Sequence, residues 1–179
     1  FQVIILGFAG VILFGALSLM LPVSSAQAII TPFHKALFTS TSAVCVTGLA
    51  VLDTGSYWSV FGQTVIMFLI QIGGLGVITT ATSVFILSGR KISIMQRSTM
   101  QNAISAPKVG GIVRLMSFIL KGTLLIELIG ALFMIPVFCH DFGLRGIWMS
   151  IFHSVSAFCN AGFDILGTKW HPFVSLPSY

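Results

Sequence analysis

The stretch FTSTSAVCVTGL at residues 38–49 decides the fold of this chain, because the sequence repeats it as FHSVSAFCNAGF at residues 152–163. The two copies are 114 residues apart and share the pairs Phe38/Phe152, Ser40/Ser154, Ser42/Ser156, Ala43/Ala157, Cys45/Cys159 and Gly48/Gly162. Each copy predicts a short helix followed by an extended strip with a glycine, set between long apolar segments. Such a repeated helix and strip is typical of a pore lined by backbone carbonyl groups.

The composition indicates a membrane protein. Of the 179 residues, 56% are hydrophobic and only 7% are charged, whereas about 25% of the residues of a soluble domain are charged. The net charge of +5 does not require nucleic acid as a partner, because the basic residues gather in one loop. The cysteines Cys45, Cys139 and Cys159 form no CxxC pair and so lack the spacing of metal ligands. We therefore expect a multi-pass protein of the plasma membrane, in contact with the lipid bilayer.

Three apolar stretches, at residues 1–21, 58–87 and 111–138, are long enough to be membrane spans. Residues 32–43 and 147–158 are too short to cross a bilayer, and they are predicted to be half-helices that end at the glycine strips. Irregular backbone at membrane depth is tolerated only where protein buries it or where it lines a water-filled cavity. The expected fold is therefore all-α, with span, pore half-helix and span in tandem.

Local signals predict where some of these elements begin and end. Thr31 and Pro32 predict the start of the first half-helix, with threonine as the N-cap and proline at the first helical position. Residues 139–146 predict an outer turn before the second half-helix. His153 lies on the second half-helix without the spacing of a metal ligand, and it is interpreted as a packed neutral side chain.

The repeat extends beyond the strips, since Gly-Ala-Leu at residues 15–17 recurs at residues 130–132. The chain divides into a first repeat at residues 1–87, a basic loop at residues 88–110 and an incomplete second repeat at residues 111–179. The positive-inside rule predicts that the loop is cytoplasmic, and docking of a cytoplasmic partner is an alternative to a purely topological role. Both repeats then start on the same side, as parallel repeats around an axis along the membrane normal.

The strips carry the predicted chemistry. A cation that sheds its water needs several oxygen ligands, and backbone carbonyls supply them without a fixed charge. Gly48 and Gly162 permit backbone angles that a side chain would forbid. The hydroxyl groups expected to hydrogen-bond the strips from behind are those of Ser40, Ser42, Thr47, Ser154 and Ser156. Asp53 and Asp164 follow the strips and are expected at the outer mouth, either to raise the local cation concentration or as solvated loop residues.

Both strips resemble the filter segments of a known family. Residues 41–49 (TSAVCVTGL) and 156–163 (SAFCNAGF) are similar to the first two filter segments of the Ktr/Trk/HKT superfamily of potassium transporters. The basic loop and the sequence GGIVR at residues 110–114 look most like the bacterial KtrB type, the ion-translocating subunit. The resemblance covers the whole chain.

This resemblance implies a subunit with four repeats around a pseudo-fourfold pore, so the chain would supply the first two and is expected to be part of a longer subunit. It implies K⁺ as the transported ion, held at the filter by the carbonyls of Cys45, Val46, Thr47, Gly48, Cys159, Asn160, Ala161 and Gly162. Family members with serine in place of Gly48 tend toward sodium, so this chain favours potassium. A sodium- or mixed-cation-conducting member is the alternative, and a dependence on Na⁺ stays open.

The resemblance also implies partners. The family's subunit forms a homodimer with two separate pores, and a cytoplasmic ring of KtrA-like regulatory subunits gates it. The nucleotide of such a system is expected on the regulatory subunit and not on this chain.

Other classes of function are less consistent with the residues. Glu127 lies inside a predicted span, where a charge is costly, and it is interpreted as the partner of a basic residue on a neighbouring helix, with coupling to H⁺ or Na⁺ as the alternative. No enzyme is expected, because the chain has no GxSxG, HExxH or Walker motif. A non-transporting assembly subunit is a third class, but it would have no reason to carry two copies of the strip.

Overall fold

The computed structural model describes residues 2–76, 112–168 and 170–175, and all its regular elements in these ranges are helical. In chain order they are α1 (Gln2–Met20), the 3-10 helix η1 (Pro22–Ser24), α2 (Phe33–Val44), α3 (Val60–Leu75), α6 (Ile112–Phe142) and α7 (Arg145–Phe158). A single isolated bridge joins Ser25 to Trp58. For the described residues, the predicted all-α class is confirmed.

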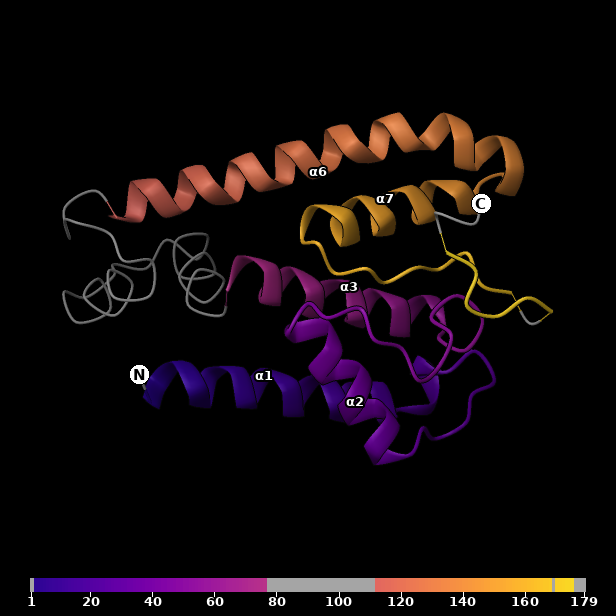
Figure 1. The fold of residues 1–179 in the computed structure, drawn as a ribbon, viewed down its shortest axis with the longest axis horizontal. Coiled ribbons are helices and arrows are strands. Elements are labelled where there is room, and N and C mark those ends of the chain that lie inside the picture. The colour runs from indigo at the N-terminus through magenta and orange to yellow at the C-terminus, as the bar shows by residue number, and fades with distance from the viewer. Residues whose placement is uncertain (1, 77–111, 169, 176–179) are drawn as a thin grey trace.

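The helices form two units that meet at α3 (Figure 1). The first unit holds α1, α2 and α3, which contact one another, and the second unit holds α6 packed against α7. α3 lies in the middle of the molecule, where it contacts α7 of the second unit. α1 and α6 begin at the same end of the molecule, and α3 runs in the opposite direction. The two units therefore point the same way.

The short helices have the lengths of half-spans. α2 has 12 residues and α7 has 14, which at a rise of about 1.5 Å per residue gives about 18 and 21 Å. Both are shorter than the hydrocarbon core of a bilayer, which is about 30 Å thick. Each half-helix packs against the long helix or helices of its own unit. Its buried residues carry hydroxyl groups as well as apolar side chains.

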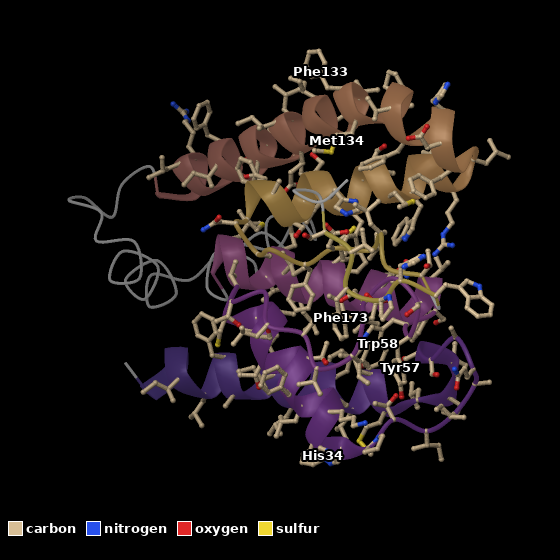
Figure 2. All side chains as sticks on the ribbon, turned by 45° about the vertical axis from the view of Figure 1, so that its right-hand side comes forward. His34, Tyr57, Trp58, Phe133, Met134 and Phe173 are labelled. Carbon is tan, nitrogen blue, oxygen red and sulfur yellow. The ribbon has the colours of Figure 1, made fainter. Side chains whose placement is uncertain are left out.

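The long helices carry apolar side chains on their outer faces. Among the described residues, one helical stretch, Ser117–Phe142, is long and apolar enough to cross a membrane, while Ile5–Met20 and Val60–Leu75 are shorter apolar helices. On α6, Phe133 is 80% exposed and points away from the molecule, whereas its neighbour Met134 points inward and packs against the core (Figure 2).

The core lies where the two units meet. Ile66, Leu69 and Ile70 of α3 are all buried, because residues three and four apart share one face of a helix. They join the fully buried Trp58, from the loop before α3, and Phe152 of α7 in one hydrophobic cluster. This cluster holds α7 against the first unit.

Two helix boundaries differ from the sequence prediction, and the first is the start of α2. Pro32, with ψ of 137°, is the N-cap itself, and no side chain caps the helix. The hydroxyl of Thr31 is fully buried and lies 3.2 Å from the hydroxyl of Tyr57. The prediction of a threonine cap is therefore wrong, because the loop before α3 engages that hydroxyl.

The second difference is the predicted outer turn at residues 139–146. α6 continues through Phe142, and Gly143 ends it with φ of 59° and an amide that donates to the carbonyl of Cys139 at 3.0 Å. Pro136 lies inside the helix without ending it. α7 begins at Arg145, so the turn is much shorter than predicted.

The predicted basic loop at residues 88–110 and the end of the first repeat at residue 87 lie outside the described residues.

Candidate functional site

Each half-helix ends in the same backbone motif. In the first copy, the amide of Val46 donates to the carbonyl of Ala43 at 3.2 Å, and the amide of Thr47 donates to the carbonyl of Ser42 at 3.0 Å. These two bonds define a Schellman motif, in which a left-handed residue follows the helix. The first strip, residues 45–49, therefore begins with its amides turned back toward α2.

The second copy repeats this geometry. The amide of Asn160 donates to the carbonyl of Ala157 at 3.0 Å, and the amide of Ala161 donates to the carbonyl of Ser156 at 2.7 Å. The second strip, residues 159–163, thus leaves α7 as the first strip leaves α2. The sequence repeat is also a repeat of backbone geometry.

The dihedral angles of the two strips agree residue by residue. φ is 57° at Val46 and 56° at Asn160, and it is 70° at Gly48 and 71° at Gly162. A left-handed β-branched residue such as Val46 is an outlier, and such a conformation costs about 1–3 kcal/mol and is common at functional sites. Val46 therefore holds a strained conformation at the start of the first strip.

The strips present free carbonyl oxygens. No described residue donates a hydrogen bond to the carbonyls of residues 45–48 or 159–162. Backbone carbonyls at membrane depth need a partner, which is then water or a cation. Among the described residues, no three His, Cys, Asp or Glu side chains are placed to hold a metal ion. Backbone carbonyl oxygens are therefore the unengaged acceptors that the described part of the two strips presents.

The two strips meet at their glycines. A Cβ atom on Gly48 would lie 2.5 Å from the carbonyl oxygen of Ala161 and 3.2 Å from the Cα atom of Gly162. A Cβ atom on Gly162 would lie 3.7 Å from the Cα atom of Gly48, which is an ordinary contact. Glycine is thus required at position 48 for two reasons: it allows the close approach of the two strips, and it accommodates the left-handed backbone.

Helix α3 seats the ends of both half-helices through adjacent glycines. A Cβ atom on Gly73 would clash with the carbonyl of Val44, the last residue of α2, and one on Gly74 would lie 2.5 Å from the Sγ atom of Cys159. The absence of a side chain at both positions therefore permits the close packing of α3 against the ends of the half-helices.

The hydroxyl groups of the half-helices divide into two sets. Ser42 contacts the hydroxyl of Thr47 at 2.9 Å, and Ser156 donates to the carbonyl of Phe163 at 2.7 Å, so both support a strip as expected. Ser40 and Ser154 do not, and for them the expectation is wrong.

Ser40 and Ser154 instead tie each half-helix to the long helix before it. Ser40 donates to the carbonyl of Ile12 on α1 at 2.7 Å, and Ser154 donates to the carbonyl of Glu127 on α6 at 2.6 Å. A glycine on each long helix makes room for the hydroxyl, and these are Gly15 and Gly130. This explains why that glycine belongs to the sequence repeat.

Ser40→Ala in the first unit and Ser154→Ala in the second unit should lower the thermal stability of the protein by similar amounts. Each change removes one interhelical hydrogen bond to a carbonyl of the long helix, at a cost of about 0.5–1.5 kcal/mol. Thermal unfolding in detergent measures this loss. Ser18→Ala is the matched control, because the hydroxyl of Ser18 makes an exposed hydrogen bond to Phe14 of its own helix. If only one of the two variants lost stability, the structural equivalence of the two units would be contradicted.

The two predicted mouth carboxylates line the space beside the glycines. A cavity of about 130 Å³ is bordered by Gly48, Gly162, Asp53 and Asp164. Asp53 accepts hydrogen bonds from the amides of Ser56 and of Phe173, both at 2.8 Å. Gly167 leaves no room for a Cβ atom beside the carboxylate of Asp53. Asp53 therefore fastens together the loops that follow both strips.

Asp164 is held by the second half-helix. Its Oδ1 atom lies 2.9 Å from the Nε2 atom of His153 and accepts the amide of Leu166 at 2.8 Å. The interpretation of His153 as only a packed side chain missed this pair. The partners are 11 residues apart, and no periodicity in the sequence joins them.

A buried glutamine joins the two units. Gln63 of α3 accepts the indole N–H of Trp148 on α7 at 2.8 Å, and its amide donates to the carbonyls of Thr54 and Trp58, both at 3.2 Å. No signal in the sequence pointed to this contact, because the two side chains are 85 residues apart.

Glu127 lies behind the second strip and is 7% exposed. Its Oε1 atom and the Nε2 atom of Gln71 are buried without a hydrogen-bond partner among the described residues. The expected basic partner of Glu127 stays a prediction.

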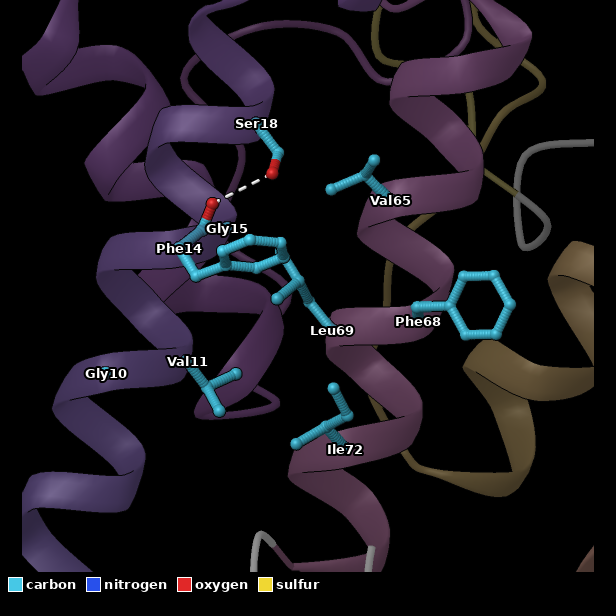
Figure 3. Close-up of a pocket in the computed structure, with 9 residues that line it drawn as sticks. All are labelled: Gly10, Val11, Phe14, Gly15, Ser18, Val65, Phe68, Leu69 and Ile72. Atoms are coloured by element: carbon cyan, nitrogen blue, oxygen red, sulfur yellow. Dashed lines mark hydrogen bonds between the residues drawn. The ribbon is translucent and has the colours of Figure 1, made fainter. Parts of the chain in front are cut away.

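A separate cavity of about 370 Å³ between α1 and α3 does not offer cation ligands (Figure 3). Its lining is apolar apart from the hydroxyl of Ser18, which donates to the carbonyl of Phe14 at 2.9 Å. The backbone carbonyl oxygens that no described residue engages belong to the strips and not to this cavity.

The chain is similar to known cation transport proteins. The chain matches the TrkH family, described as a cation transport protein, over residues 1–178. It is 47% identical over 167 residues to the potassium/sodium uptake protein NtpJ of Enterococcus hirae, covering 93% of this chain and 37% of that protein. It is 42% identical over 178 residues to the Ktr system potassium uptake protein B of Bacillus subtilis, covering 99% of this chain and 40% of that protein.

A third relative, the Ktr system potassium uptake protein B of Vibrio alginolyticus, is 36% identical over 177 residues, covering 98% of this chain and 38% of that protein. The chain thus spans about two fifths of the length of these curated relatives. The resemblance of the strips to the potassium transporter superfamily is confirmed. The family is one of cation transporters and not of enzymes, as expected. The chain belongs to the TrkH family of cation transport proteins.

Proposed function

We propose that this chain forms the first half of the ion-translocating subunit of a Ktr-type potassium uptake system. In this proposal residues 1–87 and 111–179 are two of four tandem repeats, and their strips are two of the four walls of a pseudo-fourfold filter. The observation that carries the proposal is the meeting of two geometrically matched strips at Gly48 and Gly162, with carbonyl oxygens that no described residue engages.

The proposed ligands of K⁺ are backbone carbonyls. They belong to Cys45, Val46, Thr47, Gly48, Cys159, Asn160, Ala161 and Gly162. The strips leave the C-terminal ends of α2 and α7, where the helix dipole is partly negative and favours a cation. The proposed topology places the basic loop at residues 88–110 in the cytoplasm of a cell with this protein in its plasma membrane.

The proposed partners follow the names of the relatives and the resemblance. Two relatives are named as parts of a Ktr system, which supports a multi-component assembly. We propose a homodimer with a KtrA-like regulatory subunit on its cytoplasmic side, and that the regulatory subunit binds the nucleotide.

A second candidate function is uptake of both K⁺ and Na⁺, with dependence on Na⁺ as a variant of it. It is favoured by one observation, the name of the relative that is 47% identical, a potassium/sodium uptake protein. Gly48 favours the potassium-selective function, because the resemblance associates serine at this position with sodium.

The two candidates are separated by measuring uptake of both ions. The full-length subunit that contains residues 1–179 is expressed with its regulatory partner in a host that lacks its own potassium uptake systems. Growth at low external K⁺, with K⁺ uptake much faster than Na⁺ uptake, is the expected result. Similar rates for the two ions would favour the mixed-cation function. No uptake of either ion by protein present in the membrane would contradict both and favour an assembly subunit.

A further inference from the structure

His153 is a buried titratable residue beside the second strip. Its side chain is 1% exposed, and its ring lies against Phe138 and Phe152, with centroid distances of 5.2 and 6.0 Å. The two aromatic rings and the backbone of α7 fix the orientation of the imidazole. The imidazole ring of His153 therefore has a fixed orientation relative to the second strip.

The hydrogen bonds of the ring determine where its protons lie. The Nδ1 atom is 2.7 Å from the carbonyl oxygen of Met149, one turn earlier in α7. A carbonyl oxygen only accepts, so Nδ1 carries a hydrogen and donates it. The Nε2 atom faces the Oδ1 atom of Asp164 at 2.9 Å.

The contact between Nε2 and Oδ1 requires one further proton. Without it, the lone pair of Nε2 would face the lone pairs of a carboxylate in a site shielded from water, which is unfavourable. The proton can be on either atom and still bridge the pair. The amide of Leu166 donates to the same Oδ1 atom at 2.8 Å, and the amide of Ile165 points at Nε2 at 3.4 Å.

The first unit has no such bridge. Thr39 is the counterpart of His153 and Ala50 is the counterpart of Asp164, at the same offset as the two strips. The hydroxyl of Thr39 donates to the carbonyl of Lys35 in its own helix at 3.0 Å. The first strip is instead supported by the contact between Ser42 and Thr47. The bridge is therefore a feature of the second strip and not a general property of the repeat.

We infer that His153 and Asp164 form a one-proton latch that positions the second strip at the ion pathway, and that the latch sets ion selectivity. Asp164 follows Gly162 by two residues and lines the cavity that both glycines border. A hydrogen bond from the rigid half-helix to this point fixes the end of the strip, as hydrogen bonds to ligating residues orient the ligands of a site. This inference rests on the proposed function of the strips.

The latch assigns Asp164 a role different from a free charge at the mouth. Its carboxylate is bonded to His153 and to Leu166, so hydrogen bonding rather than its field is its contribution to selectivity. Asp53 is the other acid on the cavity, and the amides of Ser56 and Phe173 engage it. His153 does not touch the ion and acts through Asp164, so it is a positioning residue.

The experiment compares K⁺ over Na⁺ preference in four variants of the full-length subunit. His153→Leu and Asp164→Leu remove the bridge and should each lower the preference about tenfold, the effect of losing one hydrogen bond to a charged group. Asp164→Asn should lose much less than Asp164→Leu, because an amide can donate to a neutral Nε2 atom. Thr39→Val is the matched control in the first unit and should keep the wild-type preference.

Each outcome decides for or against the latch. If Asp164→Asn is as impaired as Asp164→Leu, the charge acts directly on the ion and the latch is wrong. An unchanged preference in His153→Leu would also overturn it. Failure of the wild-type protein to transport a cation would count against the proposed function alone. In that case thermal unfolding tests the latch. The double variant His153→Leu/Asp164→Leu should lose less stability than the sum of the losses in the two single variants. Additive losses would refute the latch.

Discussion

Replacing Gly48 with serine is expected to lower the preference for K⁺ over Na⁺ by about tenfold or more, since a side chain in a strained backbone conformation costs about 1–3 kcal/mol. Two effects act together at this residue. Its φ of 70° disfavours any side chain, and a Cβ atom would lie 2.5 Å from the carbonyl oxygen of Ala161. Both partners are backbone, so neither can turn aside without moving a strip. The measurement is competitive uptake of K⁺ and Na⁺ by the full-length subunit.

Gly162→Ser is the informative companion of this variant. Its φ of 71° is almost the same, but a Cβ atom would have only an ordinary contact with Gly48, at 3.7 Å. We therefore expect a smaller loss of selectivity than for Gly48→Ser. Equal losses would indicate that the backbone angle alone matters, and a larger loss for Gly162→Ser would contradict the asymmetry of the contact.

Gly73→Ala is expected to lower the stability of the protein by about 3 kcal/mol, at the upper end of the usual cost of overpacking. The added methyl group would clash with the carbonyl of Val44, where α2 ends and the first strip begins. The clash is with backbone atoms and not with the end of a flexible side chain, so α3 must move away from the strip. Thermal unfolding in detergent should show a lower melting temperature, and K⁺ uptake should fall with it.

Gly122→Ala is the matched control for Gly73→Ala. Gly122 lies in α6, and a Cβ atom there would meet no atom within 4 Å among the described residues. Alanine is favoured over glycine in a helix by about 0.5–1 kcal/mol, so stability should stay the same or rise slightly. A Gly73→Ala variant as stable as this control would show that α3 does not seat the first strip.

The repeated motif predicted the elements of the site well, because its signals are local. The half-helices and the left-handed glycines follow from residues that are adjacent in sequence, and α2 and α7 lie within two residues of the predicted ranges. The recurrence of Gly15 as Gly130 also had a physical cause, since each glycine receives a serine hydroxyl from its half-helix.

The parts that the sequence did not predict depend on contacts between distant residues. Thr31 had the sequence of a helix cap, but Tyr57 lies against its hydroxyl. Ser40 was expected behind the first strip, and it binds α1 instead. The bridge between His153 and Asp164 depends on the path of the strip after Gly162, which no local pattern specifies. Propensity and spacing describe elements, whereas these bonds depend on how the elements pack.

The central claim is that the two strips bind a cation through backbone carbonyls where Gly48 and Gly162 meet. The most direct test is an anomalous-scattering map of the full-length subunit crystallised with Tl⁺ in place of K⁺. The expected result is a peak between the two strips, surrounded by the carbonyl oxygens that follow α2 and α7. A map with no peak at the strips, and with Tl⁺ bound instead to the carboxylates of Asp53 and Asp164, would contradict the claim.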